Sequence, residues 1–181
     1  MLEIIRNRRS VRSYLPQDVS DELVMKLLDA AHLAPSGHNV QPWTFIVIRD
    51  ESIKGQIAEV DHQQQWMLEA PVFIAVVADP RARGATDPGI CNEYSDLPEL
   101  KPVIRDTAIA IDHMILMAEE LGLSTCWTGW YKQDDMKRVL GVPEDRYVVG
   151  VVTVGYGAEH PDARPRKDLA ELIMYEKWQQ R

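Results

Sequence analysis

Residues 33–50 read LAPSGHNVQPWTFIVIRD and carry the chain from a helix-like segment through a loop, residues 34–42, into an apolar strand, residues 43–48. Two prolines in the loop fix φ, while the serine, glycine and asparagine between them tolerate turn geometry. The backbone therefore follows a set irregular path that exposes amides and short polar side chains. Such a loop can be a plain helix-to-strand connection, or it can grip a planar polar ligand.

A second unusual segment, residues 6–14, reads RNRRSVRSY and follows the apolar pair Ile4 and Ile5. It contains four arginines within seven residues of a chain that is otherwise acidic. Such a concentration of like charge is costly unless an anion or an acidic surface offsets it. Three interpretations are open: an anionic ligand, a solvated surface, or nucleic acid.

The composition favours one domain over residues 1–181, because 181 residues with 45% hydrophobic and 27% charged side chains can bury one substantial core. The formal charge, 20 minus 28 or −8, argues against general binding of nucleic acid or of anionic membranes. The two cysteines, Cys91 and Cys126, are too far apart in sequence to suggest a disulfide framework or a zinc site. With no signal peptide or membrane span expected either, we predict a cytoplasmic protein.

The pattern of apolar residues predicts an α+β layer with a central sheet covered by helices. Helices are expected over residues 2–9, 20–33, 52–60, 63–70, 104–121, 134–140 and 169–173, and strands over residues 43–48, 72–78, 125–130 and 147–154. Ser20 and Asp134 are the expected caps of their helices. The helix at 104–121 has apolar residues on several faces, as at a core or a subunit interface. Residues 80–101 show no firm periodicity, and a loop of that length is usually functional or mobile.

Several common motifs are absent from the sequence. Gly155-Tyr156-Gly157 follows a strand, but the third glycine of a dinucleotide fingerprint would fall at His160, where no helix pattern begins. Neither a phosphate-binding P-loop nor a Gly-x-Ser-x-Gly nucleophile motif occurs, and the five histidines fit no zinc spacing. We therefore expect no metal site, and none of these motifs supplies a catalytic acid, base or nucleophile.

The sequence RRSVR at residues 8–12, followed by APSGHNVQPW at residues 34–43, resembles the start of the nitroreductase family of FMN-dependent oxidoreductases. Further segments look like successive landmarks of that family, so that the resemblance covers nearly the whole chain: EAPVFI at 69–74, DTAIA at 106–110, LGLSTCW at 121–127 and RPRK at 164–167. The Pro35-Ser36-Gly37 form and the following PWTF also resemble the branch that contains iodotyrosine deiodinase.

The resemblance implies a mixed, mainly antiparallel sheet in an intertwined homodimer, with one FMN in each of two sites at the subunit interface. The residues it assigns to FMN are Arg8, Arg9, Ser10 and Arg12 of one subunit, Pro35, Ser36, Gly37 and Asn39 of the other, and Trp127, Thr128 and Gly129, which pass the flavin edge near N5. Arg166 and Arg164 would close on the phosphate. Arg12 would stabilise the negative charge that develops near N1 and O2 on reduction, and the Thr128 hydroxyl or the Gly129 amide would bind N5.

The implied activity takes hydride from NADH or NADPH and reduces an electron-poor small molecule, a nitroaromatic or a quinone, in a ping-pong cycle whose chemistry the cofactor carries. Residues 80–101 match no known substrate lid, and we find no acidic, tyrosine and lysine trio that would hold an iodotyrosine. A reductive dehalogenase-like enzyme is therefore an alternative below nitro or quinone reduction. A flavin carrier, or a flavin-consuming protein without NAD(P)H-driven turnover, is the other alternative.

Overall fold

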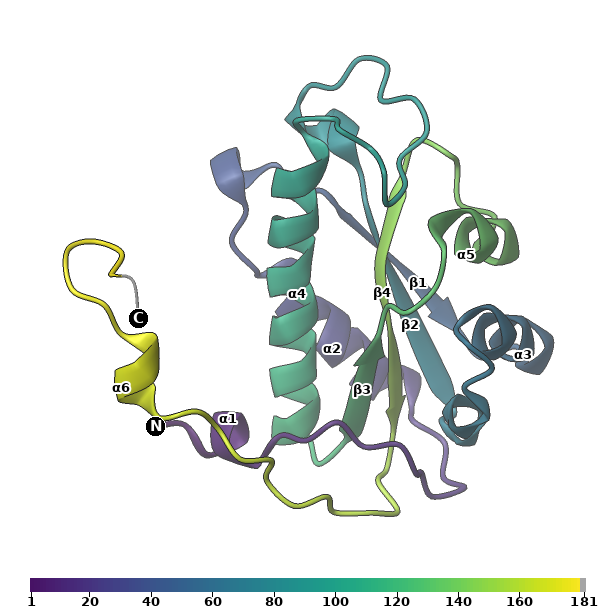
Figure 1. Ribbon diagram of the computed structural model, residues 1–181. Helices are drawn as coiled ribbons and strands as arrows, with labels where there is room; N and C mark the ends of the chain where they lie inside the picture. Colours follow the sequence, from purple (N-terminus) through teal and green to yellow (C-terminus); the bar gives the residue numbers. More distant parts are fainter. Residues whose placement is uncertain (180–181) are drawn as a thin grey trace.

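Four antiparallel strands form the centre of the molecule in the computed structural model, which describes residues 1–179 (Figure 1). They are β1 (Trp43–Ile48), β2 (Val72–Ala78), β3 (Ser124–Thr128) and β4 (Tyr147–Gly155). Their order in the sheet is β1-β2-β4-β3, and each neighbouring pair is antiparallel. Strand β3 is thus an edge strand.

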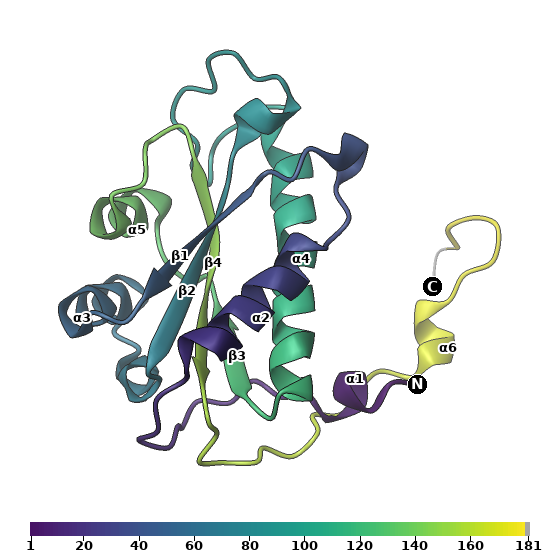
Figure 2. The ribbon, with the colours of Figure 1, turned by 180° about the vertical axis from the view of Figure 1, so that it is seen from behind.

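Helices cover both faces of this sheet (Figures 1 and 2). On one face lie α2 (Asp21–His32) and α4 (Leu100–Glu120), and on the other lie α3 (Glu51–Val60) and α5 (Gln133–Leu140). The terminal segments carry the short helices α1 (Glu3–Asn7) and α6 (Leu169–Leu172). Three 3₁₀ turns complete the list: η1 (Gly37–Asn39), η2 (Gln65–Glu69) and η3 (Pro80–Arg83).

Strand β2 lies at the centre of the fold, and all seven of its residues are buried. Alternate side chains of a strand point to opposite faces, so a strand covered on both faces reads as a continuous apolar run. Ile74 and its alternate neighbours pack into the core under α2 and α4, whereas Phe73 and Ala75 pack into the core under α3 and α5. The sequence VFIAVVA therefore serves two cores at once.

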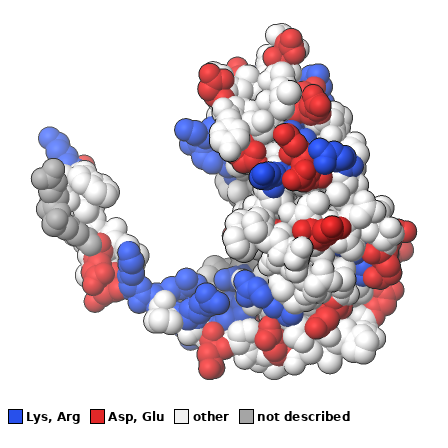
Figure 3. All heavy atoms as spheres, turned by 45° about the vertical axis from the view of Figure 1, so that its right-hand side comes forward, with Lys and Arg blue, Asp and Glu red and all other residues white. Residues whose placement is uncertain are grey.

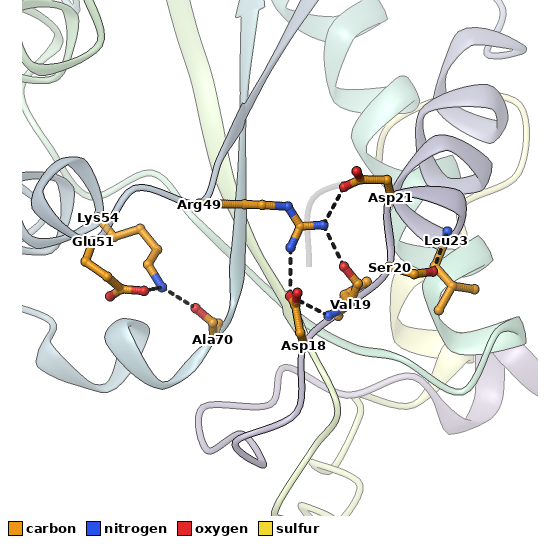
Figure 4. Close-up of polar contacts among 9 residues, drawn as sticks. All are labelled: Asp18, Val19, Ser20, Asp21, Leu23, Arg49, Glu51, Lys54 and Ala70. Atoms are coloured by element: carbon orange, nitrogen blue, oxygen red, sulfur yellow. Dashed lines mark hydrogen bonds and ion pairs between the residues drawn. The ribbon is translucent and has the colours of Figure 1, made fainter.

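Arg49, which follows β1, ties that strand to the start of α2 (Figure 4). Its guanidinium pairs with Asp18 at 2.7 Å and with Asp21 at 3.0 Å, and it donates to the carbonyl of Val19 at 2.6 Å. These contacts fix where α2 begins over the sheet, and they leave the opposite end of α2 to lead into the loop at residues 34–42.

The predicted α+β fold with a mainly antiparallel sheet is confirmed, and the only parallel contact in the described chain is an isolated bridge between Ser10 and Thr125. The Ser20 cap is confirmed as well, because its hydroxyl accepts from the Leu23 amide at 3.3 Å. The long helix begins at Leu100, four residues before its predicted start, since a proline is tolerated in the first turn, where its missing N–H has no helical partner. The intertwined homodimer stays a prediction.

Other predicted boundaries were wrong by a few residues. Strand β3 ends at Thr128 rather than at residue 130. Asp134 does not cap α5, which begins at Gln133, because the buried Gln133 amide exchanges two hydrogen bonds of 2.8 Å with the Val148 backbone and so sets the start of the helix. The predicted helices at 2–9 and 63–70 shrink to α1 and the 3₁₀ turn η2.

The predicted single domain, residues 1–181, includes two residues, 180 and 181, that lie outside the described range. Within residues 1–179, none of the helices combines the length and the apolar character that crossing a membrane requires. The same residues contain no group of three or more His, Cys, Asp or Glu side chains placed to hold a metal ion.

Candidate functional site

The arginine-rich N-terminal segment runs along the open side of edge strand β3. The Val11 amide donates to the Thr125 carbonyl at 3.0 Å, and Ser10 forms the parallel bridge with the same residue. The buried Tyr14 hydroxyl donates to the Val11 carbonyl at 2.9 Å and lies 2.7 Å from the Thr153 hydroxyl, and burial raises the pKa of Tyr14 above its ordinary value. The segment is thereby fixed to the sheet over several residues.

Two carboxylates hold the backbone of this segment. Glu69 accepts from the Ser13 hydroxyl at 3.0 Å and from the Tyr14 amide at 2.9 Å. Glu159 accepts from the Arg12 amide at 2.7 Å. Two of these three bonds go to backbone amides and the third to a serine hydroxyl, so they orient the segment while leaving its guanidinium groups to other partners.

The four predicted residues of this segment do not all face the same way. The Arg9 guanidinium donates to the carbonyls of Arg6, Asn7 and Arg8, at 2.7, 3.0 and 2.9 Å, and lines a surface cavity of about 290 Å³ with Glu119. It is thus occupied by its own backbone.

Arg8, Ser10 and Arg12 gather at Cys126 of β3 instead. Burial raises the pKa of the Cys126 thiol, and Arg12, the Ser10 hydroxyl and Arg8 oppose that rise. The Arg12 guanidinium lies over the ring of Trp66, with Cζ 5.6 Å from the ring centre. Neither Arg8 nor Arg12 forms an ion pair with a carboxylate in residues 1–179.

At the end of β3, Thr128 and Gly129 lie next to this cluster but differ in what they can offer a ligand. The buried Thr128 hydroxyl donates to the Asp61 carboxylate and accepts from the Gln64 side-chain amide at 3.1 Å. Its one proton is therefore already in use. Gly129 is exposed and has no side chain to shield its N–H.

Trp127 packs on the sheet. A Cβ placed on Gly150 of β4 would lie 1.9 Å from the Trp127 indole nitrogen, so the ring lies directly against a strand position that only glycine leaves open. The ring is still 40% exposed. It forms an apolar aromatic surface beside the end of β3.

The loop at residues 34–42 lies at the opposite end of α4. The Gly37 amide donates to Asp106 in the N-terminal part of α4 at 3.1 Å, and Arg83 pairs with the same carboxylate oxygen at 3.0 Å. His38 and Asn39 both have φ of 55°, in the left-handed region that asparagine tolerates better than most residues. The loop is thus held as a fixed projection on the protein.

Helix α4 separates the two predicted clusters. Asp106 anchors the loop near one end of the helix, while Glu119, at the other end, shares a cavity with Arg9. Thirteen residues of α-helix span roughly 20 Å. Within one chain, the segment at residues 8–12 lies along β3 and is linked through Trp66 and Gln64 to Thr128, whereas the loop that contains Pro35, Ser36, Gly37 and Asn39 lies at the other end of α4.

The last two predicted residues, Arg164 and Arg166, are exposed and belong to the segment that leaves the body after Pro161, which still lines the cavity beside Arg9 (Figure 1). Neither makes a hydrogen bond or an ion pair within residues 1–179. Figure 3 shows lysine and arginine side chains gathered along the lower part of the molecule, and a hollow between the C-terminal segment and the body. The C-terminal segment thus adds positive charge to the side of the molecule where the N-terminal arginines lie.

The donors of this region fit FMN chemically. Arg8, Arg12 and Arg166 offer guanidinium groups without a carboxylate partner in the described chain, and an exposed amide follows at Gly129. Guanidinium groups bind phosphate and reduced-flavin charge, while a flavin ring presents mainly acceptors along its polar edge. The carboxylates of the region, Glu69, Glu159 and Asp61, bind backbone amides and hydroxyls, so these guanidinium groups stay available to such a ligand.

Residues that the sequence gave no reason to single out hold these groups in place: Asp61, Gln64, Trp66, Glu69, Arg83, Asp106 and Glu159. Their local sequence assigns none of them a role. The available signals were the polar run at residues 61–65 between two helical segments, the EAPVFI segment that begins at Glu69 and the DTAIA segment that contains Asp106.

Comparison with known proteins supports the family resemblance along nearly the whole chain. The sequence profile of the Nitroreductase family matches residues 5–156. A protein of Methanothermobacter thermautotrophicus, provisionally named NADH dehydrogenase/NAD(P)H nitroreductase, is 35% identical over 98% of this chain and 87% of its own. The FMN reductase [NAD(P)H] of Bacillus subtilis is 28% identical over 92% of this chain and 69% of its own.

A solved structure, the FMN-dependent nitroreductase of Clostridium difficile R20291, superimposes with a TM-score of 0.80 at 25% identity, over 98% of this chain and 100% of that chain. The profile match extends from the N-terminal arginine segment through the loop at residues 34–42 to the end of β4. Sequence, fold and donor set agree, and the chain belongs to the nitroreductase family.

Proposed function

We propose that this protein is an FMN-dependent oxidoreductase that takes electrons from NADH or NADPH and passes them to an electron-poor small molecule, in a site completed by two copies of the chain. Membership of the family makes it an NAD(P)H-dependent oxidoreductase, and relatives include an FMN reductase and an FMN-dependent nitroreductase. The observation that carries the two-copy site is the separation of Arg8–Arg12 and Pro35–Asn39 by the length of α4.

When bound, FMN supplies the chemistry: it accepts a hydride from NAD(P)H and gives two electrons to the acceptor in a ping-pong cycle. Arg12 would face the pyrimidine edge and stabilise negative charge there, because a fixed guanidinium close to developing charge costs no reorganisation. Arg8, Ser10 and Arg166 would bind the phosphate, joined by Arg164. The Gly129 amide, rather than the engaged Thr128 hydroxyl, would donate to the central ring.

The outer face of α4 supports a symmetric pair. Arg105, Ile109 and Asp112 are exposed at helical spacing i, i+4 and i+7, and Ile109 is 40% exposed. If two copies of α4 pack antiparallel about an axis near Ile109, each Arg105 meets the Asp112 of the other copy. In the same arrangement, the loop at residues 34–42, at one end of each α4, lies next to the arginine segment at the other end of the α4 of the other copy.

The C-terminal segment supports the intertwined form of this dimer. It stands away from the body, and it exposes Leu169, Leu172, Tyr175 and Trp178 by 63–84%. Large apolar side chains so exposed on an extended arm favour burial on another surface. A second copy offers that surface, and the arm would bring Arg164 and Arg166 with it.

The acceptor we favour is a flat aromatic compound, a nitroaromatic or a quinone. The exposed Trp127 and Trp130 stand on either side of the Thr128–Gly129 pair and give the site an aromatic rim. Such rings favour stacking with electron-poor aromatic compounds. The two buried thiols, Cys91 and Cys126, suit the reducing cytoplasm expected from the sequence.

The test begins with the purified protein, its bound flavin released and identified. We expect FMN, bleached anaerobically by NADH or NADPH and re-oxidised by nitroaromatics or quinones. Bound FMN that neither nucleotide reduces at a useful rate would identify a flavin carrier instead. Preferential re-oxidation by halogenated phenols with halide release would favour the dehalogenase-like alternative, and FAD or no flavin would overturn the proposal.

A further inference from the structure

A strained turn follows α3. His62 and Gln63 both lie in the left-handed region, with φ of 58° and 56°, and neither is glycine. Such residues cost energy and persist only where the surrounding structure holds them. The turn joins α3 to η2, and it contacts Thr128, the last residue of β3, and Trp130 beyond it.

One set of contacts holds Thr128. Asp61, at the start of the turn, is fully buried, and its carboxylate accepts the Thr128 hydroxyl. The Gln64 side chain donates to the Thr128 oxygen at 3.1 Å and accepts from the Trp66 indole at 3.1 Å. A continuous series of hydrogen bonds therefore runs from Trp66 to Asp61, and it stops at the indole that lies under the Arg12 guanidinium.

The other set holds Trp130. The His62 and Trp130 rings are stacked, with centroids 3.7 Å apart and planes inclined by 8°. His62 Nδ1 also bonds the Trp130 carbonyl. A carbonyl can only accept, so Nδ1 carries the proton in this contact. Gly129 lies between two residues that are each fixed by the same turn.

Nothing in the protein's own structure requires a glycine at position 129. A Cβ built there would meet only the Val149 carbonyl, at an ordinary 3.7 Å, and its φ is not in the region that favours glycine. Glycine in such a position marks the close approach of another group to the backbone. Gly129 is exposed and its N–H has no hydrogen-bond partner in residues 1–179, so the glycine points to a ligand that comes within contact distance of the chain.

We propose that Asp61 and His62 are positioning residues that fix Gly129, so that its N–H meets the flavin ring while the Thr128 hydroxyl is held back inside the protein. This inference rests on the proposed function, in which the Gly129 amide is the donor, and it adds the turn that holds this amide in place. Asp61 is costly to bury: it is fully buried, and its carboxylate oxygen Oδ1 lacks a well-formed hydrogen bond in residues 1–179. Burial raises the pKa of Asp61, opposed by the Thr128 and Gln64 side chains, by His62 and by the Trp130 backbone amide. Such a costly group is retained for what it orients.

The first test uses the protein without cofactor and measures the backbone order parameter of Gly129 and Trp130 by NMR. We expect about 0.85 in the parent, and below about 0.6 in Asp61→Asn, His62→Leu and Thr128→Val. Thr128→Ser keeps the hydroxyl and restores the parent value. Ile57→Val trims the buried face of the same helix and serves as the control that leaves residues 128–130 unchanged. Parent-like order in all three variants overturns the positioning role.

The second test measures FMN binding to Gly129→Ala, with Gly55→Ala on α3 as the matched control, since a Cβ at Gly55 meets nothing within 4 Å. We expect the dissociation constant to rise at least tenfold in the first variant and less than twofold in the second, with both apoproteins folded. Equal affinity for Gly129→Ala and the parent overturns the close approach of FMN to Gly129 while leaving the proposed function intact. A parent that binds no FMN refutes the proposed function, and the order parameters still decide whether the turn fixes Gly129.

Discussion

The Arg12 guanidinium lies over the Trp66 ring, with its central carbon 5.6 Å from the ring centre. The Arg12 amide is bound by Glu159 at the same time, so both ends of the residue are fixed. A cation over an indole contributes about 0.5–1 kcal/mol at an exposed site. Arg12 is therefore held in one orientation without a carboxylate that would neutralise it.

The first prediction concerns the charge of Arg12. Arg12→Gln keeps a donor but removes the charge, so the two-electron reduction potential of bound FMN should fall, and reduction by NAD(P)H should slow even in fully loaded protein. A redox titration against a reference dye measures the potential. Arg138→Gln, an exposed arginine on α5, is the control. Equal potentials for Arg12→Gln and the parent would remove Arg12 from the pyrimidine edge.

The second prediction separates binding from redox tuning. Arg166→Ala should weaken FMN binding by about 1.5–3 kcal/mol, roughly 10- to 150-fold, because it loses a charged hydrogen bond to the phosphate. The potential of the flavin that stays bound should be nearly unchanged. Fluorescence titration of the apoprotein with FMN gives the affinity, with Arg138→Ala as the control. Unchanged affinity would show that the C-terminal segment does not reach the phosphate.

The third prediction tests whether each site uses two chains. Arg12→Glu and Asn39→Asp each place a negative charge in a different cluster, and aspartate keeps the shape and tolerates the left-handed backbone of Asn39. Each homodimer should bind FMN poorly. After the two proteins are unfolded and refolded together, about one quarter of all sites should be intact, because every mixed dimer has one site free of both changes. No recovery on mixing would indicate sites formed within one chain.

The fourth prediction concerns Gly37. A Cβ at this position would lie 1.9 Å from the Arg83 guanidinium, so Gly37→Ala should displace Arg83 from Asp106. We expect a loss of about 1–3 kcal/mol in the free energy of unfolding, because the ion pair is partly buried. The loss should shrink to less than half in an Arg83→Ala background. Urea denaturation of the parent, Gly37→Ala, Arg83→Ala and the double variant gives the four free energies of unfolding of this double-mutant cycle.

Gly55→Ala, in the interior of α3, is the matched control for the fourth prediction. It should stabilise the protein by about 0.5–1 kcal/mol, because alanine loses less conformational entropy in a helix than glycine does. If Gly37→Ala behaved like Gly55→Ala, Arg83 would not occupy the space above Gly37.

The fifth prediction is a pH dependence from Asp61. Burial raises its folded-state pKa above the unfolded value of about 3.9, so the folded protein binds this proton more tightly than the unfolded chain does. The contribution of Asp61 to the free energy of unfolding is therefore fully present below about pH 4, and it is lost as the pH rises through the folded-state pKa of Asp61. Asp61→Asn cannot ionise, so its free energy of unfolding relative to the parent should rise with pH over this range.

Urea denaturation of both proteins between pH 4 and 7 measures that difference. Asp29→Asn, which removes a carboxylate at the surface of α2, controls for the loss of one negative charge. A difference between Asp61→Asn and the parent that stayed constant with pH would mean that Asp61 ionises in the folded protein as easily as in the unfolded chain.

The sequence by itself determined the elements and the kind of chemistry. The elements depend on local rules: an apolar run such as β2 is buried on both faces, and Ser20 caps the helix that follows it. The chemistry follows from the family resemblance, with which four arginines in an acidic chain agree. Because helices and strands repeat regularly along the backbone, their buried residues recur at a fixed spacing in the sequence. These features can therefore be recognised without coordinates.

Only the tertiary structure decided which groups meet. The Arg12 amide bonds Glu159 across 147 positions of sequence, and the Gly37 amide bonds Asp106 across 69. Such pairs have no periodicity, since they depend on where whole elements pack. For the same reason the sequence could not reveal that α4 keeps the arginine segment and the loop at residues 34–42 apart, or that Asp61 holds Thr128. The length of one packed helix, about 1.5 Å per residue, sets that separation.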